Sequence, residues 1–322
     1  MSEPQTRMTL WGIEIFLAAV QEGSVSAAAK RLEASLSSVS QQITNLETAV
    51  GARLIDRAAR PLALTPAGVL FRRRAQVILN EALQARSELA LNDLSQLSRF
   101  RLGMIEDFDA DVTPRLLSEM AEELKTCHFV LETGASYRLA EMLENRSLDM
   151  IVAADLDLST DWMEVHPLMD DPYLVVAPKN AVPPGADVLE HLLRLPFIRY
   201  SGRQMMGRQI EAHLHRLGLS IAHRFELDSY HAIMAMVASG SGWTITTPLG
   251  YSRAQRFRDE VAVMPLPFDP LSRRIALFAR KEAMDRMPAD IAGRLRPLID
   301  RLIVRPGLAS MPWLKDGLQV LN

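Results

Sequence analysis

Hydroxyl and amide side chains crowd one short stretch, EASLSSVSQQITNLE, at residues 33–47. Val39, Ile43 and Leu46 fall at helical spacing, so we expect a helix with one buried face. Hydroxyls near a helix N-terminus can donate to phosphate oxygens, glutamine can pair with adenine, and an apolar side chain can press on a thymine methyl. The stretch therefore predicts a DNA-contacting helix, with capping and solvation as the alternative for each serine. The candidate contacts are Ser35, Leu36, Ser37, Ser38, Ser40 and Gln41.

Positive charge surrounds this stretch and is absent from within it. From Lys30 to Arg86 the sequence holds nine Lys and Arg residues and four Asp and Glu residues, although the whole chain has a net charge of -3. A locally basic segment attracts phosphate even when the chain as a whole is acidic. We expect this attraction to come from Arg31, Arg53, Arg57 and Arg60.

The elements that position these residues can be read along the chain. Residues 10–20 are amphipathic at helical spacing and end at Gly23, and SAAAKRL predicts a second short helix capped by Ser24 or Ser26. The third helix then ends near Gly51, and ARLIDRAARPLALTP predicts a two-stranded wing. Helix, helix, turn, helix is a DNA-binding arrangement. A small helical bundle of another purpose is the alternative.

The stretch from Phe16 to Gly68, which includes EGS, AAAKRL, VSQQI, LE and LTPAG in order, resembles the N-terminal signature of LysR-type transcriptional regulators. The resemblance implies a winged helix-turn-helix domain at residues 1–65 that binds double-stranded promoter DNA, with Thr65 among the contacts and RNA polymerase as a further candidate partner. The family often has Gln-Pro where this chain has Leu36-Ser37, so a base preference is not carried over.

A long helix follows the wing. Thr65 and Pro66 are good helix-start residues, and an apolar stripe continues to about Leu94. Such a stripe needs a partner helix. By the resemblance, residues 66–95 form a linker helix through which two chains make a homodimer. Dimers then pair into a homotetramer through the remainder of the chain, called the body.

From Phe100 onward, strand-like and helix-like segments alternate, which favours mainly parallel sheets with helices on both faces. This placement resembles the periplasmic-binding-protein-like effector domain of the LysR family. The expected fold class is therefore multidomain, α followed by two-lobed α/β. We expect the effector-binding domain at 96–322, with lobe one at 99–169 and 273–305 and lobe two at 170–272.

Ligands of such sheets lie outside the carboxyl ends of strands. The candidate effector-binding residues at these positions are Glu106, Asp107, Phe108, Ser136, Arg199, Ser201, Arg203, Thr246 and Thr247. The hydroxyls and arginines suit a carboxylate, whereas the acids of the first loop favour a cation or a zwitterion. A solvated acidic loop is the third interpretation. Between the first two, we expect a ligand that bears both charges, or a large one. Methionines such as Met205 and Met206 could form an adaptable pocket wall.

Other classes of protein find little support. The histidines lack metal-ligand spacing, and no nucleotide or nucleophile-elbow motif is present, so we expect no catalytic residue, no metal and no cofactor beyond a small-molecule effector. The single cysteine, Cys127, excludes an internal disulfide. With no signal pattern or membrane-length apolar run, a cytoplasmic location is expected. The alternatives are a solute-binding module with a protein-binding head, and, more weakly, an enzyme that uses the cleft.

Overall fold

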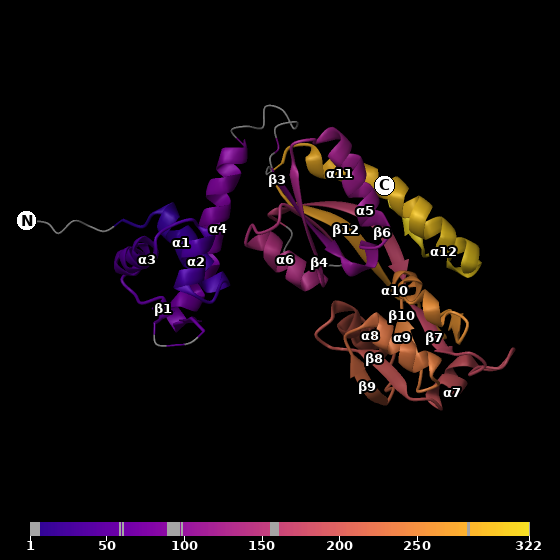
Figure 1. The fold of residues 1–322 in the computed structure, drawn as a ribbon. Coiled ribbons are helices and arrows are strands. Elements are labelled where there is room, and N and C mark those ends of the chain that lie inside the picture. Colours follow the sequence, from indigo (N-terminus) through magenta and orange to yellow (C-terminus); the bar gives the residue numbers. More distant parts are fainter. Residues whose placement is uncertain are drawn as a thin grey trace, which may run out of the picture. The chain divides into compact units, whose positions relative to one another are not determined.

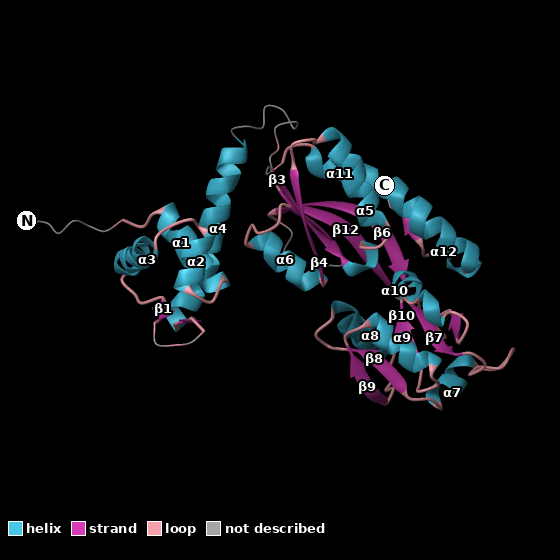
Figure 2. Cartoon of the chain, in the orientation of Figure 1, coloured by secondary structure: helices cyan, strands magenta, loops and turns pink. Residues whose placement is uncertain are grey.

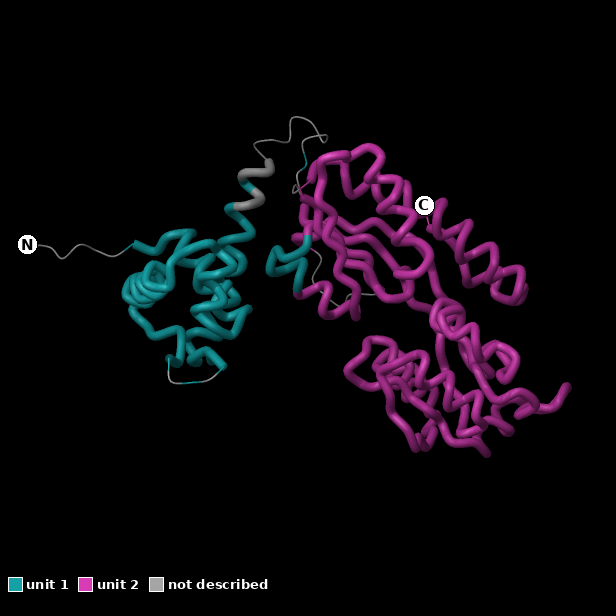
Figure 3. Tube along the Cα trace, in the orientation of Figure 1, with its two compact units in different colours: residues 1–98, 142–148 teal, residues 99–141, 149–322 magenta. Residues whose placement is uncertain are grey.

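The computed structural model describes residues 7–57, 59, 61–88, 97, 99–154, 161–281 and 284–321. The chain divides into two compact units, residues 1–98 with 142–148 and residues 99–141 with 149–322 (Figure 3). No described helix combines the length and the apolar composition that a membrane crossing requires.

The first unit contains the expected helices and wing (Figure 1). Side-chain caps fix the helix starts, because the hydroxyls of Thr9, Ser24 and Ser35 accept hydrogen bonds from backbone N–H groups of the first turns. Gly51 ends the third helix in the left-handed conformation, at φ 73°. The elements are α1 (Leu10–Gln21), α2 (Val25–Arg31), α3 (Leu36–Val50), β1 (Ile55–Asp56), β2 (Ala63–Leu64) and α4 (Pro66–Glu88).

The core of this unit joins α1, α3, the wing and the start of α4. Phe16 is fully buried and meets Phe71 of α4 edge to face at 5.4 Å. A Cβ on Gly68 would lie 2.0 Å from the carbonyl oxygen of Leu54, so only glycine lets α4 pack this closely on the wing. The predicted linker helix is observed as far as Glu88, and residues 89–95 lie outside the described residues.

The second unit is built on a six-stranded sheet in the order β13-β6-β12-β5-β3-β4. Helix α11 packs against β6, β12 and α5 (Figure 2). The elements are β3 (Arg99–Ile105), α5 (Val112–Glu123), β4 (His128–Gly134), α6 (Ser136–Glu144), β5 (Met150–Ala154), β6 (Met163–Pro172), β12 (Ser272–Arg280), α11 (Met287–Ile299), α12 (Arg305–Ser310) and β13 (Gln319–Val320).

Between β6 and β12 the chain forms two smaller sheets, ordered β10-β7-β11 and β8-β9. It leaves the large sheet after β6 and comes back through β12, so two segments join the sheets. The elements are β7 (Leu174–Pro178), α7 (Val188–Leu193), β8 (Phe197–Tyr200), α8 (Met205–Arg216), β9 (His223–Leu227), α9 (Tyr230–Ala238), β10 (Thr244–Thr246), α10 (Pro248–Arg253) and β11 (Val261–Met264).

The expectation of mainly parallel sheets is wrong. Among the described strands of the second unit, five pairings are antiparallel and three are parallel. Parallel pairing occurs where a helix separates consecutive strands, as in β3-α5-β4 and β8-α8-β9. The segments that join the sheets have no such crossover, so β12 runs antiparallel to both β5 and β6.

Candidate DNA interface and effector pocket

The polar face of α3 is exposed as predicted. Leu36 is 56% exposed, and Ser37, Ser38 and Gln41 are also exposed, whereas Val39, Ile43 and Leu46 are buried. Capping occupies Ser35, because its Oγ accepts from the Ser38 amide at 3.1 Å. The Gln41 side-chain amide donates to Asn45 at 2.9 Å, which orients it along the helix. This face exposes hydroxyl and amide groups and carries no cation of its own.

The predicted arginines differ in what holds them. Arg31 pairs with Glu22 at 3.0 Å, and Arg57 donates to Thr44 at 2.8 Å and to Glu47 at 3.2 Å. Arg53 is exposed, and no carboxylate in the described part of the chain pairs with it. Among the predicted arginines that the structure describes, Arg53 is therefore the one whose charge is least compensated.

Two further predicted DNA contacts are Arg60 and Thr65. Arg60 lies outside the described residues. The Thr65 hydroxyl donates to the carbonyl of Arg53 at 2.6 Å and accepts from the amide of Gly68 at 3.0 Å. Since a threonine has one hydroxyl proton, Thr65 has no donor left for a phosphate.

Glu47 has a structural task that the sequence analysis missed. Its Oε1 accepts from the backbone amides of Leu54 and Ile55 at 2.8 and 3.1 Å. A carboxylate that accepts two amides and one guanidinium fixes its neighbours strongly. Glu47 therefore ties the wing to α3.

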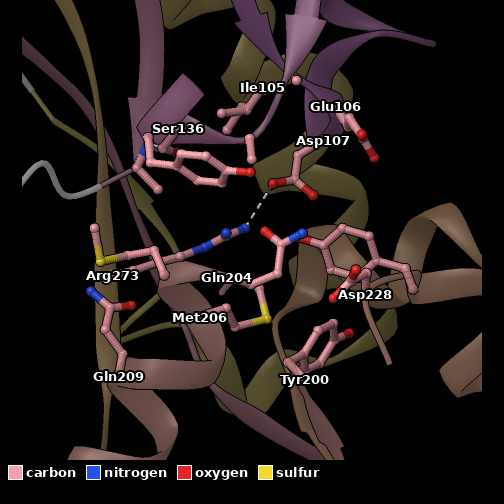
Figure 4. Close-up of a pocket in the computed structure, with 16 residues that line it drawn as sticks. Ile105, Glu106, Asp107, Ser136, Tyr200, Gln204, Met206, Gln209, Asp228 and Arg273 are labelled. Carbon is pink, nitrogen blue, oxygen red and sulfur yellow. Dashed lines mark hydrogen bonds and ion pairs between the residues drawn. The ribbon is translucent and has the colours of Figure 1, made fainter. Parts of the chain in front are cut away.

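A pocket of about 80 Å³ lies within the second unit, at the carboxyl ends of β3 and β8 (Figure 4). Of the predicted effector-binding residues, Glu106, Asp107 and Ser136 line it. Ser136 Oγ accepts from the Ala154 amide at 3.0 Å. The remaining polar, aromatic and sulfur-containing lining residues are Tyr137, Tyr200, Gln204, Met205, Met206, Gln209, Asp228, Tyr230 and Arg273.

Arg273 is the main residue that the sequence analysis missed. Its side chain is 6% exposed, and its guanidinium is held by two buried carboxylates, Asp171 at 2.8 Å and Asp107 at 3.0 Å. It also donates to the Thr247 hydroxyl at 3.3 Å. Arg273 reaches the first loop from β12, 166 positions further along the chain. Only its place in a strand otherwise rich in buried apolar residues signals a buried charge.

Burial shapes the protonation of this cluster. Removal from water raises the pKa of Asp171 to about 6, although the Arg273 charge and the Thr247 hydroxyl act to lower it. For Arg273 burial acts to lower the pKa, but the charges of Asp107 and Asp171 more than reverse this, so its pKa lies well above the usual value. Arg273 therefore stays charged, and the raised pKa of Asp171 places its titration near pH 6.

Six predicted effector residues do not line the pocket. Phe108 is fully buried in the core, and Arg199 pairs with Glu211 and Glu226 on the other side of β8. Strand alternation explains this, because Tyr200 faces the pocket and its neighbour Arg199 must face away. Ser201 is buried, and Arg203 is 83% exposed. The Thr246 hydroxyl bonds the Tyr200 hydroxyl at 2.9 Å, and the Thr247 hydroxyl accepts a hydrogen bond from Arg273.

No metal centre emerges from the part of the chain that is described. No three His, Cys, Asp or Glu side chains there are arranged to hold an ion. Three of the histidines bond other groups, and His213 contacts the Asp269 carbonyl at 2.8 Å.

Comparison with known proteins completes these observations. Residues 10–69 match the bacterial regulatory helix-turn-helix protein of the lysR family, and residues 95–296 match the LysR substrate binding domain. The chain belongs to the LysR family of transcriptional regulators. It is a DNA-binding regulator with an effector-binding domain, so the family and fold class expected from the sequence are confirmed.

Individual LysR regulators are similar over most of their length. The DNA-binding transcriptional dual regulator OxyR of Escherichia coli K12 is 25% identical over 280 residues, which span 85% of this chain and 90% of OxyR. A probable RuBisCO transcriptional regulator of Thalassiosira pseudonana is 29% identical over 248 residues, 73% of this chain and 79% of that protein.

Solved structures share the fold. A full-length OxyR variant of Pseudomonas aeruginosa gives a TM-score of 0.68 at 22% identity and covers 90% of this chain and 95% of its own. CbnR in complex with its target DNA gives 0.63 at 18% identity, with 91% and 99% covered.

Proposed function

We propose that the exposed face of α3 reads base edges while the arginines beside it hold the phosphate backbone. The observation that carries this proposal comes from the DNA-binding domain at residues 1–65, called the head below. There the polar candidate contacts and the exposed cation lie on different segments. The α3 face offers Leu36, Ser37, Ser38 and Gln41 without a cation, and Arg53 stands exposed just beyond the helix. Hydrogen bonds to base edges specify sequence, whereas cations on phosphate supply affinity that does not depend on sequence.

A homodimer formed through α4 would present two such heads to a palindromic promoter site. Val69 and Leu70 on α4 are 59% and 75% exposed, an apolar pair that a second α4 would cover. Further pairing through the bodies would make a homotetramer. We place this tetramer in the cytoplasm, where it would contact RNA polymerase at the promoter. We propose the linker at 66–95 and the body at 96–322, with lobe one at 99–169 and 273–305 and lobe two at 170–272.

The pocket beside Asp107 and Arg273 is the proposed effector site. Its wall combines residues at the edge of the large sheet with residues of α8 and α9, the helices that connect the strands of the smaller sheets. A ligand that contacts both groups favours the conformation in which they close on it, and it would thereby shift the population of DNA-binding assemblies.

The effector is bound without covalent chemistry in this proposal. Several relatives are named hydrogen peroxide-inducible genes activators. This sequence has one cysteine, which cannot form a disulfide within the chain. Burial raises the pKa of the Cys127 thiol and the charge of Asp149 adds to this, so the reactive thiolate is scarce.

The test uses DNA duplexes that carry the region upstream of the protein's own gene, with single base-pair changes. Gln41→Ala should lose about 1–3 kcal/mol on the parent duplex and lose discrimination at one base pair. Arg53→Ala should weaken binding to all duplexes alike and reduce the salt slope by about one. Gln255→Ala and Arg301→Ala, at exposed positions of the second unit, are matched controls that should change neither quantity. Uniform loss in both head variants would contradict the assignment.

A further inference from the structure

Resting on the proposed effector site, we propose that its ligand is a small organic cation, with a primary ammonium or guanidinium group bound by the carboxylates of Asp107 and Glu106. The pocket of about 80 Å³ suits a small molecule. For comparison, an engineered cavity of about 150 Å³ holds benzene.

The charges around the pocket are predominantly negative. Arg203 pairs with Asp228 at 3.4 Å, and Arg273 pairs with both Asp107 and Asp171. With each carboxylate ionised, this leaves an excess of two negative charges once Glu106 is included. The groups counted are the carboxylates of Glu106, Asp107, Asp171 and Asp228 and the guanidiniums of Arg203 and Arg273. An anionic ligand would meet repulsion here.

Arg273 lines the pocket, and two of its three guanidinium nitrogens already donate to other groups. Its Nε donates to Asp171 at 2.9 Å, and its Nη2 donates to Asp107 and to Thr247. The two arginines that the sequence offered for a carboxylate are elsewhere, since Arg199 faces the other side of β8 and Arg203 is held at the exposed Asp228. A ligand carboxylate would therefore compete with Asp107 and Asp171 for the Arg273 guanidinium.

One carboxylate oxygen of Asp107 has no hydrogen-bond donor among the described residues. The Asp107 side chain is 4% exposed and lines the pocket, and its Oδ1 has no hydrogen-bond partner within the described residues. Figure 4 shows the Asp107 carboxylate among the pocket residues, with its other oxygen bonded to Arg273. A buried acceptor without a donor is costly, and a charged N–H donor satisfies it best.

Aromatic rings also line the pocket. Tyr200 and Tyr230 meet edge to face at 5.4 Å, and both line the pocket. The Tyr200 hydroxyl is engaged with Thr246, so Tyr200 contributes chiefly its ring to the pocket. The face of an aromatic ring attracts a cation and repels an anion. Met205 and Met206 beside them suit the short apolar body of an alkylammonium.

The experiment compares three probes of nearly equal size on the full chain. Calorimetric titrations at fixed ionic strength use n-propylammonium chloride, 1-propanol and sodium propionate. We expect propylammonium to bind at least tenfold more tightly than either of the others. Asp107→Asn should weaken its binding at least tenfold, and Glu106→Gln should weaken it severalfold. Asp111→Asn, on the same loop outside the pocket, should leave it unchanged.

Each alternative outcome has a distinct meaning. Tighter binding of propionate, no binding of propylammonium, or propylammonium binding that Glu106→Gln and Asp107→Asn leave unchanged overturns the cationic assignment. Glu106 is exposed and unpaired within the described residues, so Glu106→Gln keeps the test decisive if Asp107→Asn does not fold. Specific DNA binding is measured on the same samples. Its retention leaves the proposed function standing when the cation fails, and its absence from the parent protein contradicts the proposed function instead.

Discussion

Asp171 near the end of β6 makes the pH response of this protein predictable. Its side chain is fully buried beneath the effector pocket, where it bonds Arg273, and its Oδ1 lacks a partner within the described residues. The groups that face it are Arg273, Asp107 and Thr247. The perturbation is Asp171→Asn, which keeps the shape of the side chain and removes the titration.

The size of the effect follows from the pKa. Burial raises the pKa of Asp171 from 3.8 to about 6, and each pKa unit corresponds to about 1.4 kcal/mol. The folded state holds this proton more tightly than the unfolded state does. The resulting stabilisation is therefore fully present below pH 3.8 and is lost as the pH rises through about 6. As the pH rises from 4.5 to 7.5, the unfolding free energy of the parent protein should fall by about 2 kcal/mol relative to that of Asp171→Asn.

The assay is urea unfolding of the full chain at several pH values. Trp243 is fully buried in the second unit and reports on its unfolding, once the other three tryptophans are replaced by phenylalanine in every background. The difference in unfolding free energy between parent and variant isolates this one group. Asp170→Asn is the matched control, because Asp170 is the neighbour in β6 and pairs at 2.9 Å with Arg274, which is 56% exposed.

Two results would refute this reasoning. Parallel stability curves for the parent and Asp171→Asn would mean that the buried carboxyl has an ordinary pKa. A parent that gains stability over the variant as the pH rises would mean that Arg273 lowers the pKa of Asp171 by more than burial raises it.

Three further predictions concern the head and the linker. Gly68→Ala should cost about 1–3 kcal/mol in thermal unfolding of the first unit, because its Cβ would lie 2.0 Å from the Leu54 carbonyl; an unchanged melting temperature would contradict the packing. Glu47→Ala should expose the wing to limited proteolysis, since the Leu54 and Ile55 amides lose their acceptor at a cost of about 1–3 kcal/mol; parent-like resistance would count against that tie. Leu70→Glu should weaken dimerisation in sedimentation, because Leu70 is 75% exposed on α4; an intact dimer would place the interface elsewhere.

The head was predictable because its signals are local. Serine caps, the apolar spacing of Val39, Ile43 and Leu46, and the glycine that ends α3 all act within a few residues. The predicted helix bounds consequently agree with the structure.

The pocket was only partly predictable because its key groups come from distant strands. Asp107 follows β3 and could be placed at a strand end, but Arg273 and Asp171 meet it only through the antiparallel return of β12. Strand alternation places Arg199 and Tyr200 on opposite faces of β8, but only the structure shows that the Tyr200 face meets the pocket.

The most direct test of the central claim is the affinity of the purified protein for its own upstream duplex and for a scrambled duplex of equal length and composition. At physiological salt we predict at least a ~10³-fold preference for the upstream duplex, the lower bound for specific regulators. Gln41→Ala should reduce that ratio, whereas Arg53→Ala should weaken both complexes and leave it unchanged. Equal affinity of the parent protein for the two duplexes would contradict sequence reading by α3.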